Sequence, residues 1–120
     1  MKTGRLTFAF LAGITIALSA IAAESFQQGD SLQVDTMGSL NYVDSQSVGQ
    51  TLLMRIPSRG CLLISRTMKA EQKGTLTIVP RRLTCTGLTK AIDGQLGALT
   101  VTVPTTMKYV AFPVTQTFTL

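Results

Sequence analysis

The sequence predicts an all-β protein, a small sandwich or barrel of about 7–9 short strands that is held by one disulfide. Several segments alternate apolar and polar residues, as strands with one buried face do. Clusters of Gly, Pro, Asn, Asp and Ser separate these segments and indicate turns. After residue 23 no stretch shows the sustained period of 3.6 residues that an amphipathic helix requires.

The segment 61–85 shows the strand pattern most clearly, and the rest of the chain is arranged around it. Leu76 and Ile78 alternate with threonines, Gly74 precedes them and Pro80 follows. We therefore expect a strand, a polar turn, a second strand and a third short strand that carries Cys85. The remaining segments are assigned as strands at 31–37, 40–43, 50–56, 98–103, 108–112 and 114–120, a loose arm at 24–30 and a loop at 86–97.

Residues 1–23 are predicted to be a signal peptide. Lys2 and Arg5 precede an uncharged apolar stretch, which ends in an Ala-Ile-Ala pattern at Ala22. Cleavage after Ala22 or Ala23 would start the mature chain at Ala23 or Glu24, with residues 24–120 as a single domain in the periplasm. The alternative is an uncleaved membrane anchor, because the apolar stretch is almost long enough to span a bilayer.

The two cysteines, Cys61 and Cys85, are expected to form a disulfide. Cysteines of an exported protein usually pair in an oxidising compartment such as the periplasm. Closing a loop of about 24 residues would contribute roughly 3 kcal/mol to stability. Free thiols and an intermolecular bridge are the alternatives. The chain has no histidine and no C-x-x-C spacing, so we expect no metal and no cofactor.

The composition argues against catalysis. Without histidine, the commonest general base is missing and a Ser-His-Asp or Cys-His arrangement is impossible. The six acidic residues are scattered, and no Gly-rich phosphate-binding fingerprint opens a helix. We expect no catalytic residues and no enzyme activity. A nucleic acid is also a poor partner, because the aromatic residues do not interleave with the basic ones.

Charge is unevenly distributed along the chain. Residues 24–54 contain four acids and no Lys or Arg, whereas residues 55–108 contain nine bases and two acids. This pattern fits a basic face that meets an acidic partner or lipid headgroups, or an ordinary solvated surface. In an extended segment Arg81 and Arg82 would point to opposite faces, one of them exposed and the other covering the sheet edge. The candidate partner-binding residues are Arg55, Arg59, Arg81 and Arg82.

A group of short motifs between Gly38 and Gly97 follows one order along the chain. They are Gly38-Ser39-Leu40, Ser45, Gly49, Ile56-Pro57-Ser58-Arg59-Gly60, Leu62-Leu63-Ile64, Gly74-Thr75-Leu76-Thr77-Ile78-Val79, Arg81-Arg82-Leu83 and Asp93-Gly94. This order resembles the β-barrel domain of TrbI/TraB-type subunits of conjugative type IV secretion systems. The two cysteines resemble the TraB branch. The chain departs from the family because a signal peptide stands in place of its long N-terminal part, and because we find no amphipathic helix pair.

The resemblance implies a small exported structural or interaction protein of a bacterial envelope assembly, related to conjugative transfer or to a pilus. Its partners would be other proteins of the envelope complex, through which it would associate with the outer membrane, and an oligomer is compatible with this role. It would act by docking β surface against them, with strand addition at an open edge as one mode. The alternative is a free periplasmic binding module or inhibitor that uses its basic face against an acidic target.

Overall fold

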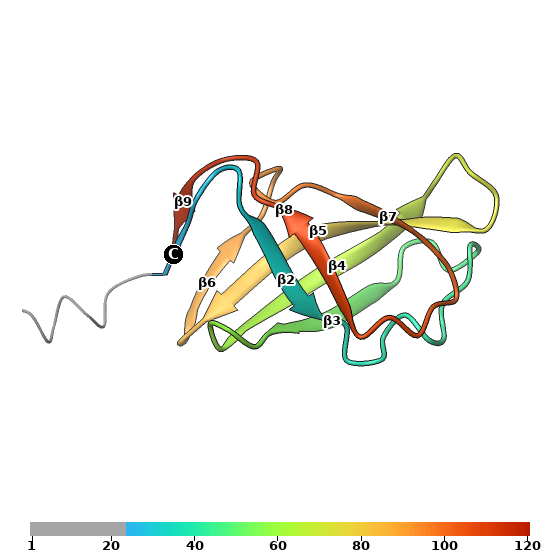
Figure 1. The fold of residues 1–120 in the computed structure, drawn as a ribbon, viewed down its shortest axis with the longest axis horizontal. Coiled ribbons are helices and arrows are strands. Elements are labelled where there is room, and N and C mark those ends of the chain that lie inside the picture. The colour runs from blue at the N-terminus through green and yellow to red at the C-terminus, as the bar shows by residue number, and fades with distance from the viewer. Residues whose placement is uncertain (1–23) are drawn as a thin grey trace, which may run out of the picture.

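The computed structural model describes residues 24–120, and within them the fold is all-β with no helix, as the sequence predicts (Figure 1). Nine strands follow one another along the chain. They are β1 (Ser25–Phe26), β2 (Ser31–Asp35), β3 (Thr51–Ile56), β4 (Cys61–Lys69), β5 (Thr75–Cys85), β6 (Leu88–Ala91), β7 (Leu99–Thr102), β8 (Tyr109–Pro113) and β9 (Phe118–Thr119). Residues 1–23, which carry the predicted signal peptide, lie outside the described part of the chain.

The strands form because their apolar residues recur at every second position. In β3, for example, Leu52, Met54 and Ile56 are buried while the residues between them are exposed. The same alternation in β2, β4, β5 and β8 builds one continuous core. Its largest fully buried side chains are Phe26, Phe112, Leu40, Leu52, Met54, Ile56, Leu63, Leu76, Ile78, Leu83, Val34 and Val43.

Seven strands form one sheet in the order β6-β5-β4-β3-β2-β8, and β7 pairs with the part of β5 that β6 leaves free. The two ends of this sheet meet. Leu96, between β6 and β7, forms an antiparallel bridge with Val114, directly after β8. The backbone N–H of Gly97 donates to the carbonyl of Pro113 at 2.8 Å. The hydrogen-bonding path therefore returns on itself, as in a small barrel.

The disulfide between Cys61 and Cys85 is confirmed. The two residues are direct partners in the antiparallel register of β4 and β5, with their Cα atoms 4.3 Å apart. Both side chains are buried in the core. The link therefore joins the start of β4 to the end of β5, across 24 positions of sequence.

The prediction of a loose arm at 24–30 is wrong. Residues Ser25–Phe26 form β1, which pairs with β9 in a separate two-stranded sheet. The Phe26 ring is only 1% exposed and stacks on Phe118 with ring centroids 4.7 Å apart. One aromatic side chain therefore anchors a stretch whose other residues are polar, because it reaches the core from outside the main sheet.

Three further assignments differ from the structure. Residues 40–43 form turns rather than a strand: the N–H of Asn41 donates to the carbonyl of Gly38 at 3.1 Å, and Leu40 and Val43 are buried without strand partners. The segment 86–97 is not a plain loop, because it contains β6 paired to the end of β5. Of the strand assigned to 114–120, only Phe118–Thr119 pairs as a strand, while Val114 makes a single bridge.

Candidate protein-interaction face

A β-bulge in β5 brings Arg81 and Arg82 to the same face of the sheet. Ile64 of β4 pairs with Arg82, and the next residue, Ser65, pairs with Pro80, so Arg81 is an extra residue on β5. Both arginines are exposed, while Pro80 and Leu83 on either side are buried. The expectation that the pair points to opposite faces is therefore wrong, because it assumed an uninterrupted alternation. The bulge also lets Pro80 lie inside a continuous strand, where a third, separate strand was predicted.

Ten outward-pointing residues of β3, β4 and β5 form a surface that we call the outer face. The strand register arranges them in three rows across the sheet. The rows are Arg55–Leu62–Thr84, Leu53–Ile64–Arg82 with Arg81, and Thr51–Arg66–Val79.

Each row of the outer face combines an arginine with at least one aliphatic side chain. Leu53 is 46% exposed and Leu62 is 42% exposed, although both belong to paired strands. Directly opposed residues of antiparallel strands have Cβ atoms about 4.5–5.5 Å apart, so Leu53 and Ile64 contact each other, and Arg55 lies beside Leu62. The result is an apolar centre with guanidinium groups around it.

The outer face carries an excess of positive charge. Its one ion pair among residues 24–120 joins Arg55 to Asp35 of β2, with 3.7 Å between the charged groups, and leaves the Arg55 side chain 55% exposed. Arg66, Arg81 and Arg82 form no ion pair within the described residues. Since no Asp or Glu belongs to the outer face, its field favours anionic groups.

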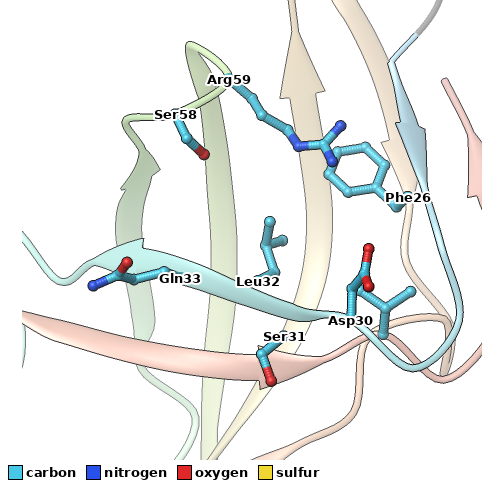
Figure 2. Close-up of a pocket in the computed structure, with 8 residues that line it drawn as sticks. Phe26, Asp30, Ser31, Leu32, Gln33, Ser58 and Arg59 are labelled. Atoms are coloured by element: carbon cyan, nitrogen blue, oxygen red, sulfur yellow. The ribbon is translucent and has the colours of Figure 1, made fainter.

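A separate pocket of about 340 Å³ lies between β2 and the turn that joins β3 to β4 (Figure 2). On β2 it is lined by Ser31, Leu32 and Gln33, and on the turn by Ser58 and Arg59. In Figure 2 the Leu32 side chain points from β2 into this space, toward Arg59. The pocket contains both polar and apolar groups and lies apart from the outer face.

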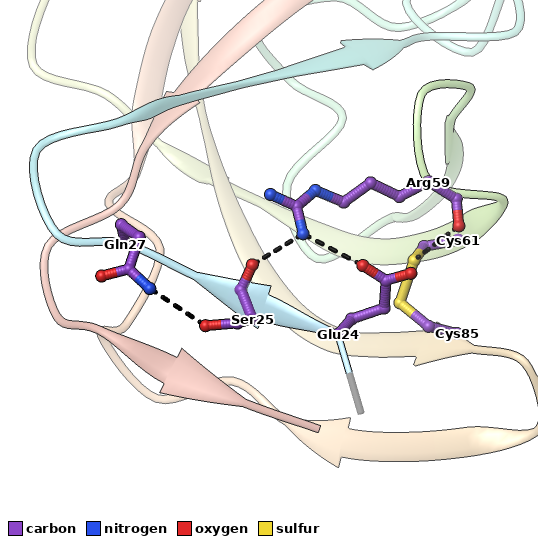
Figure 3. A network of polar contacts seen from close by, with 6 residues as sticks. All are labelled: Glu24, Ser25, Gln27, Arg59, Cys61 and Cys85. Carbon is purple, nitrogen blue, oxygen red and sulfur yellow. Dashed lines mark hydrogen bonds and ion pairs between the residues drawn. A yellow bond between two sulfur atoms is a disulfide. The ribbon is translucent and has the colours of Figure 1, made fainter. Parts of the chain in front are cut away.

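Arg59 does not belong to the outer face. Its guanidinium donates to the Glu24 carboxylate at 3.0 Å and to the carbonyl of Ser25 at 2.6 Å (Figure 3). It also lies over the Phe26 ring, 4.3 Å from the centroid. These contacts tie β1 to the β3–β4 turn, so the structure gives this arginine a role in holding the fold together.

The structure thus gathers three of the four candidate arginines, Arg55, Arg81 and Arg82, and separates Arg59 from them. It adds Arg66, which sequence reasoning did not single out. The alternation of β4 contains the missing signal, because Leu62, Ile64 and Arg66 follow one another at every second position.

The described residues offer no metal centre or transmembrane helix. Within residues 24–120, no three His, Cys, Asp or Glu side chains come together as a metal site would require. Both cysteines are held in the disulfide. No helix in this part of the chain has the length and hydropathy needed to cross a membrane.

Comparisons of this chain with protein-family models, with curated proteins and with solved structures find no match. The fold class and the disulfide follow from the structure itself.

Proposed function

We propose that this chain is a small exported interaction protein of a bacterial envelope assembly, and that it docks through its outer face onto an acidic surface of another protein. One observation carries this proposal: four arginines and four exposed or half-buried aliphatic side chains alternate on a single sheet face, and no acidic residue belongs to it.

The two kinds of side chain would contribute differently to docking. Burying the aliphatic surface of Leu53, Leu62 and Ile64 is favourable by about 25 cal/mol per Å². The guanidinium groups would bind carboxylates in bidentate geometry, which fixes the orientation of the partner and excludes basic surfaces. A partner that matches both must therefore combine apolar groups with Asp or Glu.

A protein fits this face better than a lipid bilayer or a nucleic acid. Membrane-interface surfaces are enriched in Trp and Tyr, and single-stranded nucleic acids bind where bases stack on aromatic rings. The outer face contains no aromatic residue. Arginine is among the residues enriched in protein–protein interfaces, and the aliphatic side chains match the apolar core of such an interface.

Export and the type of assembly rest on different observations. The Cys61–Cys85 disulfide is compatible with an oxidising compartment outside the cytoplasm. The assignment to conjugative transfer or to a pilus rests on the resemblance of Gly38–Gly97 to TrbI/TraB-type subunits. Docking through a sheet face is a role that such a subunit would fill.

A free periplasmic binding module or inhibitor is the second candidate, because the same basic face would serve against a soluble acidic target. The two candidates differ in the state of the isolated protein. A subunit of an assembly co-purifies with large membrane complexes, whereas a free module is a monodisperse monomer with a salt-sensitive soluble partner.

The double variant Arg66→Glu/Arg82→Glu tests the docking proposal, since neither arginine has an ion-pair partner within the described residues. We expect co-purification of the partner to fall at least about tenfold, because repulsion replaces attraction at a close contact. Lys73→Glu/Lys108→Glu is the matched control: it changes net charge equally, outside the outer face, and should retain the partner.

Equal loss of the partner in both double variants would show that only net charge matters, and would overturn the assignment of the outer face. Retention of the partner by both double variants would also overturn the assignment of the outer face. If the wild-type protein co-purifies with anionic lipid instead of a partner protein, a membrane-binding role would be favoured.

A further inference from the structure

Strand β2 is paired along its whole length on one side only. All five of its residues pair with β8, but its pairing with β3 consists of the single pair Asp35↔Arg55. Beyond that pair the chain of β3 turns away into the β3–β4 turn. Among residues 24–120, the stretch Ser31–Gln33 therefore has no neighbouring strand on the β3 side.

The hydrogen-bond pattern shows which backbone groups this leaves free. The N–H of Thr36 donates to Lys108 at 2.8 Å, and the carbonyl of Asp30 accepts from Val114 at 2.8 Å. In an antiparallel strand the direction of the backbone groups alternates with each residue, so Leu32 also bonds toward β8. The N–H and C=O groups of Ser31 and Gln33 consequently point to the opposite side.

These free backbone groups face the pocket described above. Leu32 and, from other elements, Phe26 and Val114 supply apolar surface to its wall, while Ser58 and Arg59 form the far side (Figure 2). A volume of about 340 Å³ lies at the lower end of the roughly 300–1,000 Å³ typical of ligand sites. An unpaired strand edge beside a pocket is the geometry used in β-strand addition.

We propose that this edge of β2 is an acceptor for an extended segment of a partner polypeptide, which adds as a strand between β2 and the β3–β4 turn. Ser31 and Gln33 would each exchange an N–H and a C=O hydrogen bond with it. Alternate side chains of the segment would enter the pocket and contact Phe26, Leu32 and Val114.

The chemistry of the pocket defines the segment. Its walls are apolar near Leu32, and the charges of Arg59 and Glu24 already neutralise each other at 3.0 Å. Asp30 also lines the pocket and forms no ion pair within the described residues, so it disfavours an acidic segment. Recognition therefore depends on main-chain hydrogen bonds and on small apolar side chains at alternate positions of a segment without Asp or Glu. This site goes beyond the outer face, and it uses none of the residues of that face.

The test is a titration of the isotope-labelled, exported protein with the peptide acetyl-Ser-Val-Thr-Val-Ser-amide, followed by nuclear magnetic resonance of backbone amides. We expect the amide signals of Ser31 and Gln33 to shift. Gln33→Pro removes the free N–H but no bond to β8, so it should fold and weaken binding at least about tenfold. Gln33→Ala removes only the side chain and should bind within about twofold of wild type, since main-chain bonds carry the recognition.

The same peptide with its central threonine N-methylated is the control on the ligand side, and it should also bind at least about tenfold more weakly. If Gln33→Pro fails to fold, the comparison of the methylated and unmethylated peptides alone tests the proposal. Unchanged affinity of the methylated peptide, shifts confined to another edge such as β6, or no shift up to about 10 mM peptide would each overturn the proposal. Arg66 and Arg82 take no part in this test, so its failure leaves the proposed function of the outer face standing.

Discussion

Ser65 and Thr67 occupy successive inward positions of β4, and both side chains are buried, but their hydroxyl groups differ in hydrogen bonding. Thr67 Oγ1 accepts from the N–H of Gln50 at 2.8 Å and donates to the carbonyl of Ser47. Ser65 Oγ is buried and has no hydrogen-bond partner within the described residues. A buried polar group without a partner costs stability, whereas a satisfied one contributes to it.

Ser65→Ala is therefore expected to raise the free energy of unfolding by about 1 kcal/mol, because it removes an unsatisfied buried hydroxyl. Thr67→Val is the matched comparison on the same strand. It should lower the free energy of unfolding by about 1–3 kcal/mol, because it leaves the Gln50 N–H and the Ser47 carbonyl without a partner. Urea denaturation measures both, and a destabilising Ser65→Ala would contradict the assignment.

The disulfide gives a second prediction for single residues. The variant Cys61→Ala/Cys85→Ala should lose about 3 kcal/mol of stability, because the cross-link no longer restricts the unfolded chain. Reduction of the wild-type protein should shift its urea midpoint in the same direction. Equal midpoints for the oxidised and reduced wild type would show that the cross-link contributes nothing.

At the scale of elements, the contact between Gly97 and Pro113 lies where the ends of the main sheet meet. A Cβ atom at position 97 would lie 2.7 Å from Cγ of Pro113, which is too close for both atoms. Glycine there allows the backbone of residues 95–97 to approach the end of β8 closely enough for the 2.8 Å hydrogen bond.

Gly97→Ala should therefore destabilise the protein by about 1–3 kcal/mol through overpacking. Pro113→Ala removes the clashing atom, so the double variant Gly97→Ala/Pro113→Ala should recover most of this loss. Thermal or urea unfolding of the single and double variants measures the coupling. If the double variant is as unstable as Gly97→Ala alone, the contact between residues 97 and 113 is not what limits the approach of the two sheet ends.

Some elements could be predicted from the sequence and others could not, depending on how local their pattern is. Alternation and turn residues gave β2, β3, β4, β7 and β8 within a few residues, because their pattern is local. By contrast, the segment predicted as a loose arm contains β1, because Phe26 stacks on Phe118 near the other end of the chain. The bulge at Arg81 depends on the register between β4 and β5, and neither strand shows that register on its own.

For the whole molecule, the described contacts begin at Glu24, whose carboxylate binds Arg59 and whose carbonyl accepts from Leu120 at 3.0 Å. Both contacts remain in a chain that starts at Ala23 or Glu24. The basic residues, the apolar stretch and the Ala-Ile-Ala pattern within residues 1–22 predict a periplasmic product that lacks residues 1–22 or 1–23 and contains the Cys61–Cys85 disulfide. Intact mass with and without reductant and alkylation measures both features. A full-length, membrane-bound product with two free thiols would contradict export.

The candidate site could be predicted only in part. The sequence identified a basic region and three arginines that the fold gathers on the outer face. It could not separate Arg59, which is held by Glu24 and Phe26, because those contacts join positions more than 30 residues apart. It also missed the pocket beside β2, which exists because β2 and β3 share only one residue pair.

The proposed function requires that the outer face binds an acidic protein surface. Photo-crosslinking from a reactive residue at Leu62 in the living cell tests it most directly, with Tyr42, 91% exposed and outside that face, as the control position. We expect Leu62 to crosslink to one protein and Tyr42 not to, and we expect Arg66→Glu/Arg82→Glu to abolish the crosslinked product. Crosslinks from Leu62 to lipid alone, no crosslink from Leu62, or the same protein captured equally from Tyr42 would contradict it.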